Sequence, residues 1–425
     1  MLNPSLPCGK WEDVLSSLPS HLDLNQTAFK CGALRRRRQV SDSTDLLRLA
    51  LAYGPCGMSL RSTSAWASMS GLGELSDVAV LKRLKGAHEW LGVIVAELLS
   101  EAGGQSFPNG HRLRLVDGTC IAGPASKGTD WRIHASYDPA AGCFTHLEIT
   151  DVHGAESLTR GPALPGDIHI ADRGYAQAKG LHRILEDGSD FIVRTGWRKV
   201  RLRHMNDTQF DLFAMLPEAD YDRPVGYPVD IKGSTKETDV PARLIILRKP
   251  PQATEQERKR LRRTASKKGS KLNPASLVAA EYMLLLTSLP AEEFDANSIA
   301  ELYRIRWQIE LAFKRLKSLI HIDRLPAKDP ALARSWLLSH LILALLIERQ
   351  SEECLSHVPP DQNRQERTPS LWRINKLLLQ ALLSAIQGIW DTSGITGKAR
   401  SFWRAMCEPP RKRKVQRIPK YNLLS

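Results

Sequence analysis

Hydrophobic and polar positions repeat along this chain with two different periods, and the first hundred residues follow the helical one. Apolar residues there recur every three to four positions, which predicts helices. Three stretches show this spacing between glycine-rich breaks: TDLLRLALAY from Thr44, SLRSTSAWASM from Ser59 and SDVAVLKRLKGAHEWLGVIVAELL from Ser76. Ser59 and Ser76 are predicted N-caps, because a serine hydroxyl accepts a hydrogen bond from a free backbone N–H of the first turn.

These helices leave two interpretations open. A helix-turn-helix would place the helix that carries Lys82, Arg83 and Lys85 in the major groove of DNA. A plain helical bundle with a basic, solvated face fits the same pattern equally well.

From His111 the period changes to that of strands, with short β-rich runs between Gly, Pro and Asp turns. The runs are RLRLVD, WRIHASYD, CFTHLEIT, DIHIAD and DFIVR, and a helical QAKGLHRILED precedes the last of them. This order predicts a mixed α/β layer. Beyond Trp197 the runs VRLRHM, VDIKG, ARLIILR and EYMLLLTS indicate further strands, before a long helix near Ser298.

The remainder of the chain is expected to be helical, with a linker at Val358 to Pro369 and a basic tail. The tail carries six cations and no acid after Pro410, which suggests an arm on phosphates. We therefore expect five regions along the sequence. They are a helical DNA-binding region (1–105), a first α/β core segment (106–196), a mostly β region with a basic segment (197–290), a second core segment with a long helix (291–350) and a helical C-terminal region (351–425).

Charge and cysteine usage narrow the class of partner and compartment. The 425 residues hold 60 Lys and Arg against 46 Asp and Glu, a net charge of +14, which favours acidic polymers, above all nucleic acid. Seven scattered cysteines without a CxxC pair indicate neither a disulfide framework nor a zinc site. The N-terminus lacks a signal-peptide pattern, and the apolar stretch Trp336 to Ile347 is too short for a bilayer. We expect a cytoplasmic, nucleoid-associated protein.

A basic run, ERKRLRRTASKKGSK, lies from Glu255 to Lys271. Such runs are commonly solvated and partly disordered. Contact with a DNA backbone is the alternative, and the sequence leaves both open.

Near residue 300, Tyr303, Arg306, Glu310 and Lys317 share one stripe of the predicted helix. At about 100° per residue they fall within an arc of roughly 60°, and Lys314 lies on the same stripe. An acid flanked by cations in this way suits a metal ion beside a phosphate. Taken alone, Glu310 and Lys314 are also an ordinary i,i+4 ion pair.

Two aspartates supply further candidate chemistry. Asp117 and Asp172 each follow an apolar run and precede or nearly precede a glycine, which predicts carboxylates at strand ends. Either one alone could be a turn-forming residue. Taken with Glu310, they provide three carboxylates without a His or Cys partner, a donor set that suits Mg²⁺ or Mn²⁺.

Three motifs together carry a resemblance to a known family: LVDGT around Asp117, IADRGY around Asp172, and Tyr303-x2-Arg306-x3-Glu310-x6-Lys317. With them the chain resembles the DDE transposases of bacterial insertion sequences, specifically the insertion sequence 4 family with its YREK signature, most strongly from 110 to 325. The resemblance implies an RNase H-like core, interrupted by a mostly β insertion between the second aspartate and the glutamate.

The resemblance also implies roles for these residues. Asp117, Asp172 and Glu310 would hold two Mg²⁺ or Mn²⁺ ions, with Asp117 as the bridging ligand. Tyr303, Arg306 and Lys317 would hold phosphates near the transposon end, with Lys314 as an additional candidate. Trp197 is either a base-stacking residue or an ordinary core residue.

The implied activity is cleavage of the element's terminal inverted repeats and transfer of the DNA ends to a target, by a cut-and-paste route. The implied partners are double-stranded DNA and a second copy of the chain in the synaptic complex. Two rival functions remain: a nuclease that never joins DNA, and a DNA-binding protein without activity. The full set of three carboxylates favours an enzyme.

Overall fold

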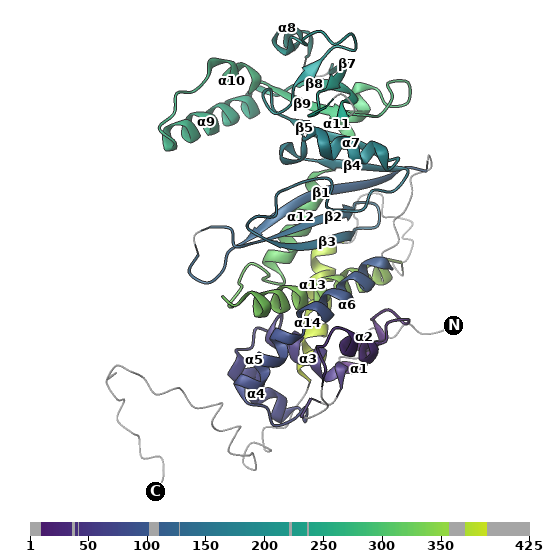
Figure 1. Cartoon of the computed structure of the whole chain (residues 1–425), viewed down its shortest axis with the longest axis vertical. Helices are drawn as coiled ribbons and strands as arrows, with labels where there is room; N and C mark the ends of the chain where they lie inside the picture. Colours follow the sequence, from purple (N-terminus) through teal and green to yellow (C-terminus); the bar gives the residue numbers. More distant parts are fainter. Residues whose placement is uncertain are drawn as a thin grey trace, which may run out of the picture. The chain divides into compact units, whose positions relative to one another are not determined.

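The computed structural model describes most of the chain, in which helices come first and last in the sequence and the strands lie between them (Figure 1). The described residues are 10–35, 39–40, 42–101, 110–126, 128–220, 223–235, 238–356 and 370–388. Contacts divide the chain into two compact units. The first combines Met1–Val95 with Asp329–Leu343 and Leu379–Ser425, and the second combines Ala96–Lys328 with Ala344–Leu378.

The first unit is helical. Its elements are α1 (Trp11–Ser16), α2 (Leu24–Lys30), α3 (Ser43–Tyr53), α4 (Leu60–Met69), α5 (Asp77–Gly86) and most of α6 (His88–Ser100). Both predicted N-caps are confirmed, since Ser59 accepts from the Ser62 N–H and Ser76 from the Ala79 N–H. Each such cap stabilises its helix by about 1 kcal/mol.

The single helix predicted from Ser76 is wrong, because it is divided into α5 and α6. Gly86 ends α5, and glycine is among the weakest helix formers. His88 Nδ1 then bonds to the Lys85 carbonyl at 2.9 Å, which marks the break. Lys85 forms a 2.8 Å ion pair with Asp329, so one of the three cations proposed for a DNA groove already has an acidic partner.

Two later helices complete the first unit. The ends of α13 (Pro330–Ser356) and α14 (Leu371–Gln387) join it through buried polar contacts. Ser335 Oγ donates to the Leu84 carbonyl at 2.5 Å, and Arg48 Nε donates to the Ile386 carbonyl at 2.8 Å. These helices therefore tie the C-terminal half of the sequence to its beginning.

The second unit is built on a nine-stranded mixed sheet. The strands are β1 (Arg112–Ile121), β2 (Trp131–Asp138), β3 (Cys143–Asp151), β4 (Asp167–Ala171), β5 (Asp190–Thr195), β6 (Leu202–Arg203), β7 (Val225–Ile231), β8 (Val240–Arg248) and β9 (Tyr282–Thr287). Their spatial order is β3-β2-β1-β4-β5-β9-β8-β7-β6. β1, β4 and β5 run parallel, and the other pairings are antiparallel. Every strand-like run in the sequence lies on one of these strands.

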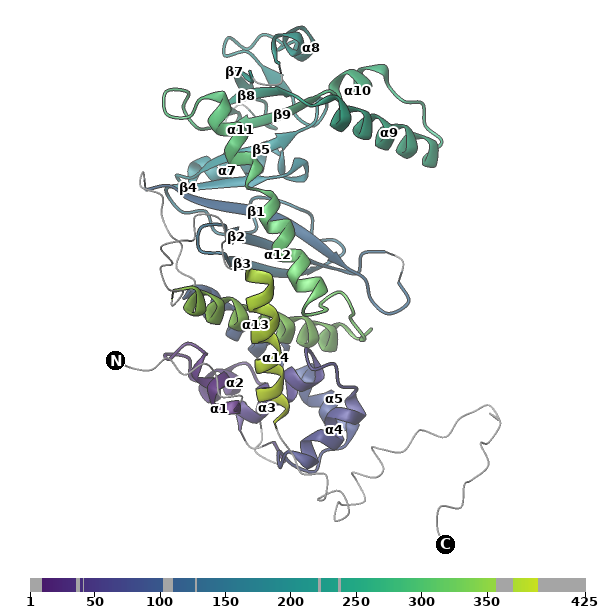
Figure 2. The ribbon, with the colours of Figure 1, turned by 180° about the vertical axis from the view of Figure 1, so that it is seen from behind.

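The second unit also contains several helices. They are η1 (Arg173–Tyr175), α7 (Ala178–Glu186), α8 (Leu212–Met215), η2 (Leu216–Glu218), α9 (Pro251–Lys267), α10 (Pro274–Ala279), α11 (Ala296–Arg304) and α12 (Trp307–Ser318). Figure 2 shows α12 running across the face of β1 and its neighbours. β4 is buried at all five positions, as expected for a parallel strand in the middle of a sheet.

The basic run is not a disordered segment, contrary to the first expectation for it. Most of it belongs to α9, which projects beside β9 together with α10 (Figure 1). Pro251 begins the helix, and a run of good helix formers, Arg, Lys, Glu, Gln and Ala, continues it. Arg258 anchors α9 by an ion pair with Glu281, just before β9.

The helix α13 is long and apolar enough to cross a membrane by length and composition alone, which the 12-residue estimate from the sequence did not capture. It is the one such helix in the described residues, and 78% of its most apolar window is buried inside the protein. Burial of this kind is typical of a core helix. The predicted linker at 358–369 and the basic tail after Pro410 lie outside the described residues.

Candidate active site

The two aspartates are brought together by the parallel pairing of β1 with β4. Their ladder ends where Val116 faces Ala171, and Asp117 and Asp172 are the next residues on each chain segment. Paired strands lie about 4.8 Å apart, so both aspartates sit at the same edge of the parallel ladder. β1 itself continues beside β2 as far as Ile121. The prediction that Asp117 ends its strand is therefore wrong, because β1 continues to Ile121. Asp117 does directly follow the last residue of β1 that pairs with β4.

The predicted continuous helix through residues 303–317 is also wrong. α11 ends at Arg304 and α12 begins at Trp307. Between them the backbone stays in the right-handed helical region, but the N–H groups of Ile305 and Arg306 bond three residues back, to Leu302 and Tyr303. This tighter turn leaves Tyr303 on α11 and Glu310 on α12, with Arg306 at the junction.

Arg306 and Tyr303 connect the three candidate carboxylates. The Arg306 guanidinium reaches Asp117 Oδ2 at 3.4 Å through Nη1 and also pairs with Glu310 Oε1 through Nη2. Tyr303 Oη donates to Asp172 Oδ1 at 3.4 Å. The structure thus gathers five predicted site residues, Asp117, Asp172, Tyr303, Arg306 and Glu310, around one guanidinium and one phenol.

Burial differs between these groups and sets their electrostatics. Burial raises the pKa of Asp117 to about 6, and the negative charges of Glu156 and Asp172 act in the same direction. The Gly118 N–H, which donates to Asp117 Oδ1 at 2.8 Å, and the Arg306 charge partly offset this rise in pKa. Glu310 is the most open of the three, with 56% of its side chain exposed. The site therefore combines two half-buried aspartates with an exposed glutamate.

Lys317 and Lys314 lie further along α12. Lys317 Nζ donates to the Cys120 carbonyl of β1 at 3.3 Å, so it stands beside the strand that carries Asp117. Lys314 is exposed, and no ion pair or hydrogen bond of its side chain is found among the described residues. Lys317 is therefore placed against the sheet, whereas Lys314 faces solvent.

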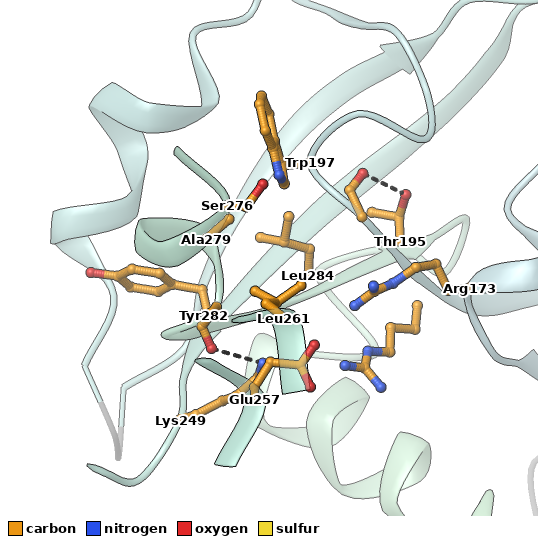
Figure 3. Close-up of a pocket in the computed structure, with 13 residues that line it drawn as sticks. Arg173, Thr195, Trp197, Lys249, Glu257, Leu261, Ser276, Ala279, Tyr282 and Leu284 are labelled. Atoms are coloured by element: carbon orange, nitrogen blue, oxygen red, sulfur yellow. Dashed lines mark hydrogen bonds between the residues drawn. The ribbon is translucent and has the colours of Figure 1, made fainter. Parts of the chain in front are cut away.

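Trp197 lines a recess whose wall also includes Arg173, the residue that follows Asp172 (Figure 3). The recess has a volume of about 90 Å³ and is partly open to solvent. One Trp197 edge packs against Phe213 at 5.4 Å between ring centroids, and Arg198 Cζ lies 4.2 Å from the indole centre. Trp197 is half-buried. It therefore has a packing partner and an accessible side, and both sequence interpretations stay open.

Cations crowd the same recess, and the sequence motifs did not single them out. Arg173, Arg194 and Lys249 line it, with Glu257 as the acid among them. Burial, followed by the charge of Arg194, lowers the pKa of Lys249 to about 8. Arg194 Nη1 also lies 3.7 Å from Asp172 Oδ1. The isolated arginine in the otherwise apolar run DFIVR was the one signal for Arg194 in the sequence.

Comparison with known proteins decides the family. The family described as "Transposase DDE domain" matches residues 108–346, which include all of the residues above. This chain belongs to that family. It is a DDE transposase, an enzyme of DNA cleavage and strand transfer, and both rivals considered from the sequence are set aside at the level of family.

Several curated relatives of this transposase come from insertion sequences. The putative transposase InsL for insertion sequence element IS186A of Escherichia coli (strain K12) is 42% identical over 354 residues, covering 82% of this chain and 96% of the relative. The transposase for insertion sequence element IS421 of Escherichia coli is 41% identical over 355 residues with the same coverage. The transposase for IS231B of Bacillus thuringiensis subsp. berliner is 23% identical over 345 residues, 70% of each chain.

One solved structure also matches the transposase, a piggyBac transposase synaptic complex with hairpin DNA. The alignment covers 88% of this chain and 78% of the piggyBac chain, with a TM-score of 0.45 and 9% sequence identity. A similarity at this level carries no inference about the site.

The family depends on divalent cations, and the donor set of this transposase is of the right chemistry. Asp117, Asp172 and Glu310 are hard oxygen donors of the kind that Mg²⁺ and Mn²⁺ prefer. In the described residues, no three His, Cys, Asp or Glu side chains lie close enough to hold an ion as they stand. The Arg306 guanidinium forms ion pairs with both Asp117 and Glu310. By the chemistry of their donors, these three residues fit a divalent cation.

Proposed function

We propose that this transposase is of the insertion sequence 4 type, with Tyr303, Arg306, Glu310 and Lys317 as its YREK signature. It would bind the terminal inverted repeats of its own element, cut the DNA there and join the ends to a target by a cut-and-paste route. The observation that carries the proposal is the meeting of Asp117, Asp172 and Glu310 around Arg306. Acids from three distant parts of the chain rarely converge without a chemical reason.

The sheet order supports an RNase H-like core. In the first five strands, β3-β2-β1 form an antiparallel meander, and β4 and β5 add to β1 in parallel. Such an arrangement is expected of that fold, with the first acid on the central strand and the second on its parallel neighbour. β6 to β9 and the helices α8 to α10 then lie between Asp172 and Glu310, where the insertion of this type is expected.

In the proposed reaction, Asp117, Asp172 and Glu310 would hold divalent cations. Bound Mg²⁺ or Mn²⁺, two ions in this proposal, supplies the Lewis acidity that activates the attacking oxygen and stabilises the leaving 3′-oxygen. The raised pKa of Asp117 reflects a charge that a nearby cation would stabilise. The carboxylates thereby orient the reacting phosphate at the edge of the β1–β4 ladder.

Arg306 has a second task in this proposal. A guanidinium can form two parallel hydrogen bonds to a phosphate as readily as to carboxylates. When a cation is bound by Asp117 and Glu310, Arg306 would be released to the phosphate of the transposon end, with Tyr303 as a hydroxyl donor beside it. Lys317 and Lys314 extend this phosphate contact along α12.

We further assign the recess of Trp197 to the same DNA end. Its indole would stack on a displaced base, and Arg173, Arg194 and Lys249 would neutralise the adjoining phosphates. Base–aromatic stacking contributes about 1–3 kcal/mol per base. The lining of the recess supports this assignment, because its three cations outnumber its one acid, Glu257.

The other regions are assigned by charge. Region 1–105 would recognise the inverted repeats, and the C-terminal region 351–425 would contact DNA through its basic tail. Regions 106–196 and 291–350 would form the catalytic core, and region 197–290 would form the insertion. Two copies of the chain would pair the element's ends as a homodimer on cytoplasmic, nucleoid-associated DNA.

The test separates binding from chemistry. Purified Glu310→Gln protein is compared with wild type for gel-shift binding to an end fragment and for cleavage of that fragment in Mg²⁺. Cleavage should fall by more than about 100-fold, since even losing an outer partner of a metal ligand costs 10–100-fold, while end binding stays within about twofold. Glu301→Gln, which removes the same charge from an exposed position of α11, is the matched control. Normal cleavage by the Glu310 variant would contradict the proposal.

A further inference from the structure

The side chain of Glu156 lies against Gly118 and Gly174, the two glycines that closely follow Asp117 and Asp172 in the sequence. It belongs to the loop after β3, outside every motif identified in the sequence. A Cβ atom at Gly118 would lie 3.6 Å from Glu156 Oε1, and a Cβ atom at Gly174 would overlap Glu156 Oε2. The carboxylate of Glu156 therefore occupies the space that both glycines leave open, next to Asp117 and Asp172.

The backbone of this loop is fixed from several elements. Gln177 Nε2 donates to the carbonyls of Glu156 and Gly174, each at 3.0 Å. Arg132 Nη1 donates to the Gly154 carbonyl at 2.7 Å, and Arg160 Nε donates to the Ala155 carbonyl at 2.6 Å. These bonds hold the Glu156 backbone at the site and do not use its carboxylate.

The carboxylate of Glu156 has no ion pair of its own among the described residues. Arg160 directs its guanidinium to Glu148 at 2.9 Å, and Arg132 Nη1 donates to the Gly154 carbonyl. A carboxylate with a merely structural role would be expected to take one of these arginines. Glu156 instead is a half-buried acid beside Asp117 that forms no ion pair among the described residues.

Tyr175 is an independent sign that the same spot receives a polar group. Its side chain is 2% exposed, and its Oη has no hydrogen-bond partner among the described residues. That oxygen lies 3.6 Å from the Cβ position of Gly118, as close as Glu156 Oε1 does. Buried polar atoms are nearly always paired, so a hydroxyl directed at two acids indicates a site completed by bound water or an ion.

We propose that Glu156 is a fourth acidic residue of the catalytic centre, a positioning residue whose carboxylate accepts hydrogen bonds from the water shell of the divalent cation held by Asp117 and Asp172. This inference rests on the proposed function. Mg²⁺ gives up its waters reluctantly and keeps several of them in protein sites. Partners in such an outer shell orient the inner ligands and contribute strongly to affinity. Tyr175 would donate to the same water network.

The test measures cation binding without DNA and without turnover. Free Mn²⁺ is titrated by electron paramagnetic resonance against wild type, Glu156→Gln, Asp117→Asn and the charge-matched control Glu301→Gln. Glu156→Gln should raise the Kd for Mn²⁺ by 10–100-fold, and the control should match wild type. Thermal unfolding by circular dichroism confirms that each variant is folded.

A second pair of variants tests the same site by adding a methyl group next to the Glu156 carboxylate. Gly174→Ala should displace the Glu156 carboxylate and weaken Mn²⁺ binding, whereas Gly118→Ala meets only ordinary van der Waals distances and should bind as wild type does. In a Glu156→Ala background, Gly174→Ala should have little further effect, because its target is gone.

The outcomes distinguish the proposed role of Glu156 from the proposed metal site. Loss of Mn²⁺ binding by Asp117→Asn, with wild-type binding by Glu156→Gln and Gly174→Ala, would overturn the role of Glu156 and leave the proposed function standing. Wild-type binding by Asp117→Asn would contradict the proposed metal site itself.

Discussion

At the scale of single residues, Arg306 explains how the acids of the site coexist. Its guanidinium contacts Asp117 and Glu310, and its Cζ lies 5.9 Å from the centre of the Tyr303 ring. Only 14% of its side chain is exposed. A cation at this position neutralises the carboxylates and also competes with any metal ion for their oxygens.

Replacing Arg306 by Ala should therefore have two opposite effects. Mn²⁺ binding to the free protein should tighten, by up to about tenfold, because the competing cation is removed. Binding to a precleaved end should weaken by about 1.5–3 kcal/mol, the usual contribution of a charge-assisted hydrogen bond. Titration calorimetry with Mn²⁺ and a gel shift with precleaved DNA measure the two quantities.

Arg304→Ala is the control for this variant, because Arg304 is exposed at the end of α11 and forms no ion pair with these acids among the described residues. Weaker Mn²⁺ binding by the Arg306 variant, with the control unchanged, would show that Arg306 supports the cation rather than competing with it.

Much of this residue set could be predicted from spacing, and the remainder could not. LVDGT, IADRGY and the Tyr303-to-Lys317 spacing single out residues that the structure brings together. Glu156 and Arg194 were missed because they approach the aspartates through a loop and through the end of β5. Proximity of that kind depends on tertiary packing, which leaves no periodic trace in the sequence.

At the scale of elements, α9 presents a cationic stripe. Lys259, Arg263 and Lys267 recur every four residues, so they rise about 6 Å apart along one side of the helix. All three are exposed and have no ion pair among those found for the described residues of α9. The neighbouring Arg260, by contrast, is held by Glu257. A stripe of this geometry fits a line of DNA phosphates.

Removing the stripe should weaken DNA binding without regard to sequence. The triple variant Lys259→Ala, Arg263→Ala, Lys267→Ala should lower the slope of log K against log salt by about 2.7, at about 0.9 per phosphate contact. Fluorescence anisotropy on end and random duplexes at several salt concentrations measures this slope. A control that replaces Lys10, Lys179 and Lys328, three exposed cations outside α9, removes the same charge, and an equal effect of both triples would refute a specific role for α9.

A second element-level prediction concerns the packing of α13 against β3. Glu348 accepts a hydrogen bond from the Phe144 N–H at 3.0 Å, and burial raises the pKa of its carboxyl to about 7. Because the folded-state pKa exceeds the unfolded value near 4.5, Glu348 disfavours the folded state as pH rises from about 4.5 to 7, by up to about 3 kcal/mol.

Glu348→Gln keeps an acceptor for Phe144 but cannot ionise. Urea unfolding should show the variant more stable than wild type at pH 8 and close to wild type at pH 4.5. A stability difference that does not change with pH would contradict the raised pKa of Glu348.

The elements themselves were largely predictable, and their ends were not. The strand runs were found because β-branched and apolar residues alternate with turn residues over short spans. The α5–α6 and α11–α12 breaks were missed, because a hydrogen-bond shift from four to three residues back leaves the apolar period almost intact. The segment that forms α9 was expected to be partly disordered because of its high charge. Arg, Lys, Glu and Gln are also good helix formers, and here they form a helix.

At the scale of the whole molecule, the two compact units each draw on separated parts of the sequence. The first joins the N-terminal helices to pieces of α13 and α14, and the second encloses the sheet and the candidate site. Periodicity is a local property of the sequence, so it predicts only regions made of consecutive residues. Contacts such as that of Arg48 with the Ile386 carbonyl join residues hundreds of positions apart and are invisible to it.

The most direct test of the account uses a supercoiled plasmid that carries the DNA flanking this gene, incubated with the purified protein in Mg²⁺ or in EDTA. The transposase should cut the plasmid at the element ends and form strand-joined products in Mg²⁺, and it should do neither in EDTA. Scattered metal-dependent nicking without joining, or specific binding with no cut in Mg²⁺ or Mn²⁺, would contradict this account.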